Sequence, residues 1–359
     1  MLGLAMMTIV AAQAPSCAAL HDLIDDGQIC VQTPAGLVVA DSRERADYLA
    51  GLAVVGERRF QARFRVTVPS YAVVEMVGQS VDPRIDAALQ AQGVKWRLPW
   101  LSESATIAAY RASIERAVTA KAQAMGLGAE QTVTLVQSAL AQQADKFTPT
   151  ALRDKEASAL PHELGHGWLT KAFWPKAVAG SSDHYGGPAP DWLDETAAIL
   201  MEDDTLANSR RSRFTAIYRG PNAVARAELI DLSSFLSGGH PALPKIDLTG
   251  ATAGVRVLTG AEAAGIVAAA SGFYLQARVF ADYMLVRSGQ PDAFRSAADA
   301  FAGGKTLADW LASDGARLHL PTTVTAVQAD WEAWLRSRDA TLPTPETAAA
   351  RTGVGRMEK

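Results

Sequence analysis

The stretch ALPHELGHGWL places two histidines, His162 and His166, four positions apart, with Glu163 directly after the first. Side chains four residues apart lie on one face of an α-helix, one turn above each other, so both imidazoles can reach a single ion if this stretch is helical. Glu163 then lies beside the ion, where a carboxylate can accept a proton from an attacking water molecule. The spacing therefore predicts a helix that carries a metal-dependent site.

Chance is a poor explanation of this pattern. The chain has six histidines in 359 residues, and a shuffled sequence of this composition would contain H-E-x-x-H in fewer than about one chain in a hundred. Pro161 lies within the stretch and lacks the N–H that an interior helical position uses. We therefore expect the helix to begin near Ser158 or to bend there.

Charge and hydropathy exclude several classes of partner. Lysine and arginine number 34 against 38 acidic residues, with a pI near 5.9, so no broad cationic surface is available for nucleic acid. No membrane span is expected, because the alanine-rich segment 260–288 is interrupted by Glu262, Arg278 and Asp282. The sequence carries no signal for an oligomeric state.

The N-terminal segment predicts export. Residues 1–14 form an apolar run that ends in Ala12-Gln13-Ala14, the small-x-small pattern of a signal-peptidase site. We therefore expect a signal peptide and a periplasmic or secreted protein. In an oxidising compartment Cys17 and Cys30 could close a short loop worth about 3 kcal/mol, whereas in a cytosol they would remain two thiols.

Periodicity predicts an α+β protein. Residues 28–78 are interpreted as strand, helix and strand, with GLVVA as the first strand, Ser42 as the helix N-cap and residues 62–77 as the second strand. Residues 102–145 indicate two helices split at 126–128, and the chain stays mostly helical after Thr148. The predicted organisation has four parts: a signal peptide at 1–14, an N-terminal α/β and helical subdomain at 15–147, a zinc-binding helical catalytic subdomain at 148–339, and a disordered tail at 340–359.

A second motif follows at residues 192–202. HELGHGWL followed by WLDETAAILME resembles the H-E-x-x-H-x-W and W-L-N-E-G pair of the aminopeptidase-N-like and peptidase MA-like gluzincins, a group of zinc metallopeptidases. The resemblance implies a mostly helical, thermolysin-like catalytic domain. It also implies that Glu195 is the third zinc ligand and that Glu202 holds a ligand histidine in place.

A third match lies at residues 271–294 and resembles the family helix whose leading tyrosine faces the zinc. By that resemblance Tyr274 donates a hydrogen bond to the oxyanion of the reaction, and Tyr283 and Tyr218 are the alternatives.

The sequence also departs from the family pattern. Twenty-eight residues separate His166 from Glu195, Asp194 replaces the usual Asn, and Thr196 replaces the usual Gly. The exopeptidase signature G-x-M-x-N is absent, which favours an endopeptidase over an aminopeptidase.

Other polar residues offer alternatives. Asp183 and His184 lie in GSSDHYGG, a stretch close to one in the aspzincins, and are rival third ligands. We interpret His240 and His319 as loop or core histidines rather than ligands.

The basic cluster SRRSRF at 209–214 is interpreted as a solvated helix face. If it is functional, Arg210 and Arg211 could instead hold a substrate carboxylate. Trp331 and Trp334 are expected in the core.

The sequence thus predicts a zinc metallopeptidase that acts on a peptide or protein substrate. His162, His166 and Glu195 would hold one Zn²⁺ per chain, Glu163 would be the general base and Tyr274 the oxyanion donor. The alternatives are a catalytically inactive, zinc-stabilised binding module of the same fold and a hydrolase of a non-peptide substrate.

Overall fold

The structure is a computed structural model, and it describes residues 14–24, 27–76, 81–177, 184, 187–241 and 260–337, with side chains in the last range described from residue 270. Except for residue 14, the predicted signal peptide lies outside the described residues. So do the predicted tail at 340–359 and the rival ligand Asp183.

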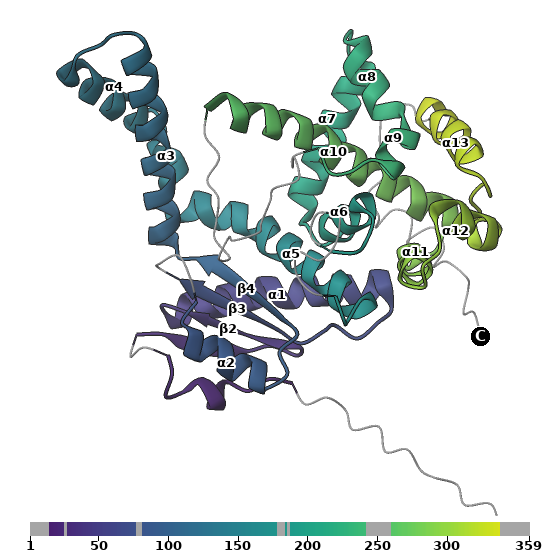
Figure 1. Cartoon of the computed structure of the whole chain (residues 1–359), viewed down its shortest axis with the longest axis horizontal. Helices are drawn as coiled ribbons and strands as arrows, with labels where there is room; N and C mark the ends of the chain where they lie inside the picture. Colours follow the sequence, from purple (N-terminus) through teal and green to yellow (C-terminus); the bar gives the residue numbers. More distant parts are fainter. Residues whose placement is uncertain are drawn as a thin grey trace, which may run out of the picture.

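A four-stranded sheet forms the N-terminal part of the chain (Figure 1). Its order is β1 (Ile29–Gln32), β2 (Gly36–Ala40), β3 (Tyr71–Met76) and β4 (Trp96–Leu101). The strands β1 and β2 are antiparallel, whereas β2, β3 and β4 are parallel. The two parallel connections run through α1 (Arg43–Phe64) and α2 (Pro83–Ala91).

The sheet is covered on both faces. Every residue of β2 is buried, which fits a parallel strand between two layers. Leu37 and Val39 pack with Leu89 of α2 on one face, whereas Val38 and Ala40 join the main core with α1 on the other. A disulfide between Cys17 and Cys30 ties the first turn of the described chain to β1.

The rest of the chain is helical. The remaining helices are α3 (Glu103–Ala124), α4 (Ala129–Ala141), α5 (Pro149–Phe173), α6 (Asp191–Ile199), α7 (Asp204–Arg219), α8 (Ala223–Ile230), α9 (Leu232–Ser237), α10 (Gly260–Ser288), α11 (Ala293–Ala302), α12 (Leu307–Asp314) and α13 (Val324–Ser337). Short 3₁₀ turns lie at Cys17–Leu20, Ala144–Phe147 and Ala316–Leu318. Among the described residues, no helix has both the length and the apolar character needed to cross a bilayer.

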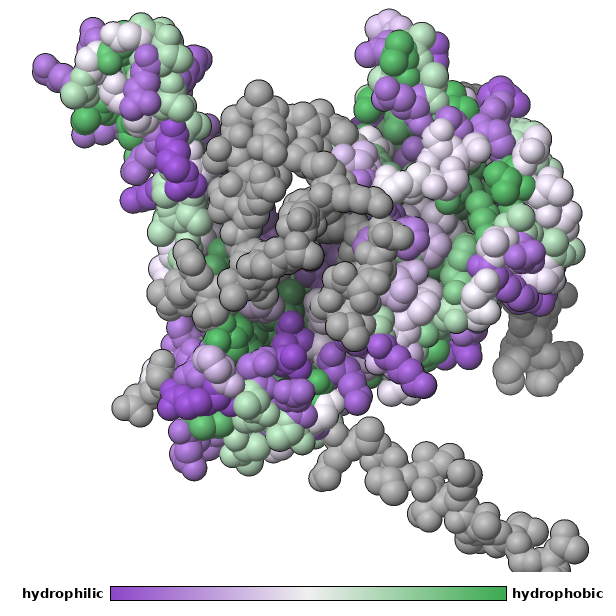
Figure 2. All heavy atoms as spheres, viewed as in Figure 1, coloured by the Kyte–Doolittle hydropathy of each residue, from purple (hydrophilic) through white to green (hydrophobic). Residues whose placement is uncertain are grey.

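Helices α3 and α4 form a hairpin that projects from the body (Figure 1). In these two helices only Ala122 is buried. Apolar and hydrophilic side chains are interspersed on the visible face of this hairpin (Figure 2), and Tyr110 and Val133 are among its exposed apolar residues.

Helix α5 runs through the centre of the molecule and contacts both the sheet layer and the helical part. It begins at Pro149, capped by Thr148, and continues through Pro161. The predicted start near Ser158 is therefore wrong, because tertiary packing on both sides of α5 outweighs the one backbone hydrogen bond that the proline removes. Leu160, Leu164 and Trp168 are fully buried on this helix.

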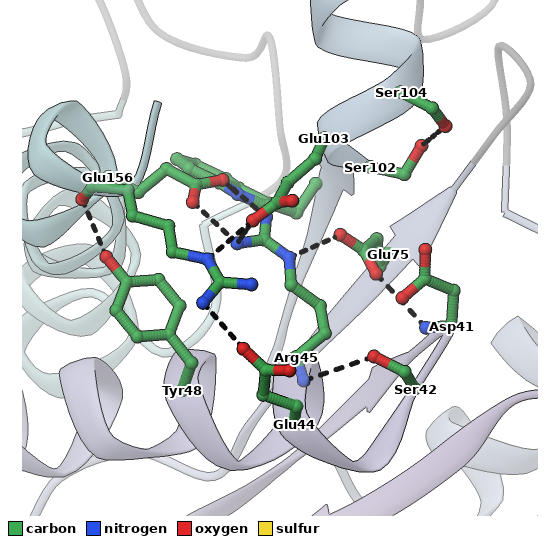
Figure 3. A network of polar contacts seen from close by, with 12 residues as sticks. Asp41, Ser42, Glu44, Arg45, Tyr48, Glu75, Ser102, Glu103, Ser104 and Glu156 are labelled. Carbon is green, nitrogen blue, oxygen red and sulfur yellow. Dashed lines mark hydrogen bonds and ion pairs between the residues drawn. The ribbon is translucent and has the colours of Figure 1, made fainter. Parts of the chain in front are cut away.

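A buried arginine joins α5 to the sheet layer (Figure 3). Arg45 of α1 donates to Glu75 of β3 at 2.8 Å and to Glu156 of α5 at 2.6 Å. The same guanidinium contacts Glu103 of α3 at 3.4 Å. These contacts fix where α5 lies over the sheet.

The α+β class, with a small N-terminal sheet and a mostly helical remainder, agrees with the sequence prediction. Ser42 caps α1 as predicted, and the helices α3 and α4 are split at Gly126 as predicted. The predicted strand at 62–77 is wrong in its first part, because α1 continues to Phe64 and β3 begins only at Tyr71. Strands β1 and β4 and helix α2 were not predicted.

Candidate metal centre

Two histidines and one glutamate converge where α5 packs against α6. His162 Nε2 lies 3.3 Å from His166 Nε2 and 3.3 Å from Glu195 Oε1. His166 Nε2 lies 3.9 Å from Glu195 Oε2. Two ligand atoms held 2.0–2.1 Å from a tetrahedral zinc ion would lie about 3.3 Å apart. The two separations from His162 match that spacing, and the separation from His166 to Glu195 is wider.

The close approach of α5 and α6 depends on a glycine. A Cβ added at Gly165 would lie 2.9 Å from Ala198 Cα and 3.2 Å from the carbonyl oxygen of Ala197. Any larger residue at position 165 would therefore push α6 away from α5. Because Gly165 directly precedes His166, the small residue brings Glu195 within reach of both imidazoles.

The other nitrogen of each imidazole is anchored on a carboxylate. His162 Nδ1 lies 3.0 Å from Glu202 Oε1, and His166 Nδ1 lies 2.9 Å from Asp194 Oδ2. Ionised carboxylates only accept, so both Nδ1 atoms donate, and in a neutral imidazole Nε2 is then left with its lone pair. Carboxylate partners of this kind orient the ligand histidines of metal sites.

The donor set calls for a cation. Two Nε2 lone pairs that face each other at 3.3 Å repel unless a proton or a metal ion lies between them. The buried Glu195 Oε1 and Asp194 Oδ1 atoms have no hydrogen-bond partner, which is costly for an ionised group. Among the described residues, His162, His166 and Glu195 form the group that could hold an ion, and its two nitrogens and one carboxylate suit zinc.

Burial and charge act against each other at this centre. Burial alone would lower the pKa of His162, but the charge of Glu195 and the hydrogen bond to Glu202 outweigh it and raise the pKa above its ordinary value. Burial likewise opposes protonation of His166, yet Asp194 and Glu195 raise the pKa of that imidazole to about 10. Burial raises the pKa of the Glu195 carboxyl, against the opposing charges of the two histidines. A proton and a metal ion therefore compete for the same nitrogens.

The predicted general base lies beside the ligands and is open to solvent. Glu163 is exposed, whereas the side chains of His162 and His166 are each only 12 % exposed. The negative charge of Glu163 contributes to the raised pKa of both histidines, so the carboxylate lies near them.

The predicted tyrosine also lies at the centre. The ring of Tyr274, on α10, is 6.3 Å from the ring of His162 and perpendicular to it. Tyr274 is half-buried. Of the alternatives, Tyr283 is buried and its hydroxyl donates to Asp330 at 2.8 Å, and Tyr218 stacks on Phe214.

His240, which the sequence set aside, also lies at this centre. His240 is buried, as expected of a core histidine, but its Nε2 lies 3.8 Å from Glu195 Oε2 and its ring lies 5.5 Å from that of Tyr274. His184, the rival ligand, lies 3.4 Å from Asp191 and is 44 % exposed. His319 is exposed, on a turn after α12.

The interpretation of the basic cluster as a solvated face is wrong for two of its members. Arg210 donates to Glu202, and Arg211 is buried against Asp282 at 2.7 Å. Both guanidinium groups already bind protein carboxylates, so neither is available in this state for a substrate carboxylate. Trp331 and Trp334 are buried, as predicted, and they stack on each other.

Glu202 accepts a hydrogen bond from His162, the contact that the resemblance implied. The contact of Asp194 with His166 was not predicted from the sequence, and the available signal was its position directly before Glu195, on the same buried helix.

In the comparisons with known proteins, no family model, no curated protein and no solved structure matches this chain.

Proposed function

We propose that this protein is a zinc-dependent metallopeptidase of the thermolysin-like gluzincin type, with His162, His166 and Glu195 as the zinc ligands. The observation that carries the proposal is the convergence of these three side chains with ligand spacing, while each histidine is held from behind by a carboxylate. A bound zinc ion would supply Lewis-acid activation of water and of the scissile carbonyl group.

Glu163 acts as the general base. It accepts the proton of the water molecule that attacks the peptide carbonyl carbon, and it later passes that proton to the leaving amine. Two observations support this role: Glu163 is exposed, and its charge acts on both histidines.

Tyr274 stabilises the oxyanion that develops on the carbonyl oxygen. Its ring faces His162, and the two alternatives are less suitable. Tyr283 is committed to Asp330, and Tyr218 lies on α7 against Phe214.

The substrate is a peptide or protein that is cut internally. The absence of the G-x-M-x-N segment supports an endopeptidase over an aminopeptidase. We also propose that the protein is exported, and the disulfide between Cys17 and Cys30 supports an oxidising compartment.

Cleavage of a mixed peptide library, read by mass spectrometry, tests this proposal. We expect internal cuts by the zinc-loaded protein and a loss of about 10²- to 10⁴-fold in rate for Glu163→Gln, because the amide cannot accept a proton. The zinc content of Glu163→Gln should stay at one per chain. Asp154→Asn, an exposed change on the same helix, serves as the matched control and should keep full activity.

The other outcomes are equally informative. Stepwise loss of N-terminal residues would replace the endopeptidase with an aminopeptidase. A Glu163→Gln variant that cuts at the unaltered rate would contradict the mechanism, and zinc-loaded protein that cuts nothing would contradict the peptidase assignment.

A further inference from the structure

Arg210 on α7 is turned toward the candidate metal centre rather than toward solvent. Its side chain is 14 % exposed, and it binds Glu202 through two hydrogen bonds. Nε donates to Glu202 Oε2 at 2.7 Å, and a terminal nitrogen donates to Glu202 Oε1 at 2.5 Å. This is the bidentate pairing in which a guanidinium fixes both oxygens of a carboxylate.

The fixed carboxylate in turn orients a zinc ligand. Glu202 Oε1, which accepts from Arg210, also accepts from His162 Nδ1 at 3.0 Å. The Glu202 side chain is only 1 % exposed, so without a cationic partner its ionised form would be costly. Arg210 therefore holds the Glu202 carboxylate in the position from which it accepts from His162.

The same guanidinium also supports the proposed oxyanion donor. The Arg210 Cζ atom lies over the ring of Tyr274, 5.1 Å from its centroid. A guanidinium that lies on the face of a tyrosine ring attracts it and restricts its position. Arg210 thus contacts both Glu202, in the turn between α6 and α7, and the ring of Tyr274 on α10.

Neighbouring arginines on α7 show that this placement is specific. Arg211 forms an ion pair with Asp282 instead, and Arg213 is exposed. Lysine could not replace Arg210, because an ammonium group lacks the planar fork that binds both Glu202 oxygens and covers the ring.

We propose that Arg210 is a positioning residue. It holds Glu202, and through Glu202 it fixes the position of His162 relative to Tyr274. This inference rests on the proposed function, since it assumes that His162 is a ligand and Tyr274 the oxyanion donor. Arg210 itself contacts neither ion nor substrate in this scheme.

The test uses the whole protein with Arg210→Ala and Arg210→Lys. We expect kcat to fall about 10- to 100-fold in both, as is typical when outer partners of a metal ligand are removed, with the KM changed little. Arg210→Lys keeps the charge and guards against a variant that fails to fold. Arg213→Ala, one turn away on the same helix, should behave as the unaltered chain.

A readout that does not need turnover is the visible spectrum of the cobalt-loaded protein, because its bands depend on ligand geometry. We expect Arg210→Ala to alter this spectrum. Guanidinium ion, added at concentrations too low to denature the protein, should restore both the spectrum and kcat. Urea is planar and of similar size but uncharged, so it should restore neither.

Each result separates the proposals. If kcat and the cobalt spectrum of Arg210→Ala match the unaltered chain, or if guanidinium and urea act alike, the positioning role is overturned. If the unaltered chain cuts no peptide but its cobalt spectrum responds to Arg210→Ala and to guanidinium, the peptidase assignment fails while the positioning of His162 stands. A chain that binds no cobalt would overturn both.

Discussion

Helix α5 carries two buried clusters of charged residues that differ in how their polar atoms are satisfied. Near its N-terminal end Glu156 joins the cluster around Arg45 (Figure 3), and two turns later His162 joins the candidate metal centre. In the Arg45 cluster, the Glu156 oxygens accept from Arg45 and from Trp100. In the candidate metal centre, Glu195 Oε1 is buried and has no hydrogen-bond partner.

Charge alone does not distinguish the two clusters, since carboxylates outnumber guanidinium groups in both. In the Arg45 cluster, burial raises the pKa of Glu75, and the hydrogen bonds from Arg45 and from the Asp41 backbone oppose that effect. In the metal centre the histidine nitrogens face each other, and Asp194 Oδ1 also has no hydrogen-bond partner. The carboxylate oxygens of the Arg45 cluster thus find their donors within the protein, as expected of a structural cluster. The candidate metal centre leaves two buried carboxylate oxygens without a donor, as expected of a site that binds a ligand.

Breaking the Arg45 cluster should have the largest effect of the changes that test this comparison. Arg45→Met leaves Glu75 and Glu156 buried without their main partner, and removing one side of a buried ion pair costs about 3–5 kcal/mol. We expect a loss of that size in the free energy of unfolding, measured with urea. Zinc affinity of the folded fraction should be unchanged, and a large fall in affinity would mean that the two clusters are coupled through α5.

Removing the carboxylate partner of His166 should weaken zinc binding, with a smaller effect on the free energy of unfolding. Asp194→Ala deprives His166 Nδ1 of its acceptor, and we expect zinc affinity to fall about 10- to 100-fold, measured by competition with a chromophoric chelator. Asp194→Asn keeps an oxygen that accepts from His166, so its zinc affinity should lie between that of Asp194→Ala and that of the unaltered chain. Glu75→Gln, in the Arg45 cluster, is the control and should leave the affinity unaltered.

The pH dependence should have opposite signs for metal binding and for the stability of the metal-free protein. The pKa of His166 is raised to about 10, so one proton must leave for zinc to bind, and the affinity should rise about tenfold per pH unit from neutral pH toward that value. For the metal-free fold, a folded pKa above the unfolded value of about 6.5 stabilises the protein fully below pH 6.5. That contribution is lost as the pH rises through about 10. Chelator competition measures zinc affinity across this pH range, and thermal melts measure the stability of the metal-free protein. A zinc affinity independent of pH would contradict the proposed ligand role of His166.

Much of the fold could be predicted because its signals are local. Ser42 begins α1 through a side-chain cap, and Gly126 separates α3 from α4. Strand β4 was missed because it contains Pro99, which is tolerated there only because β4 is the edge strand of the sheet. Whether a strand lies at an edge depends on the whole sheet and cannot be known from six residues.

The candidate metal centre likewise has a part that local sequence determines and a part that only the tertiary structure determines. The spacing of His162 and His166 already places both imidazoles on one helix face, because helical geometry is set within a single turn. The positions of Asp194, Arg210 and His240 around that face were not predictable in the same way. They depend on how α6, α7 and the chain after α9 pack against α5, and that packing is decided by long-range contacts such as the approach of Ala198 to Gly165.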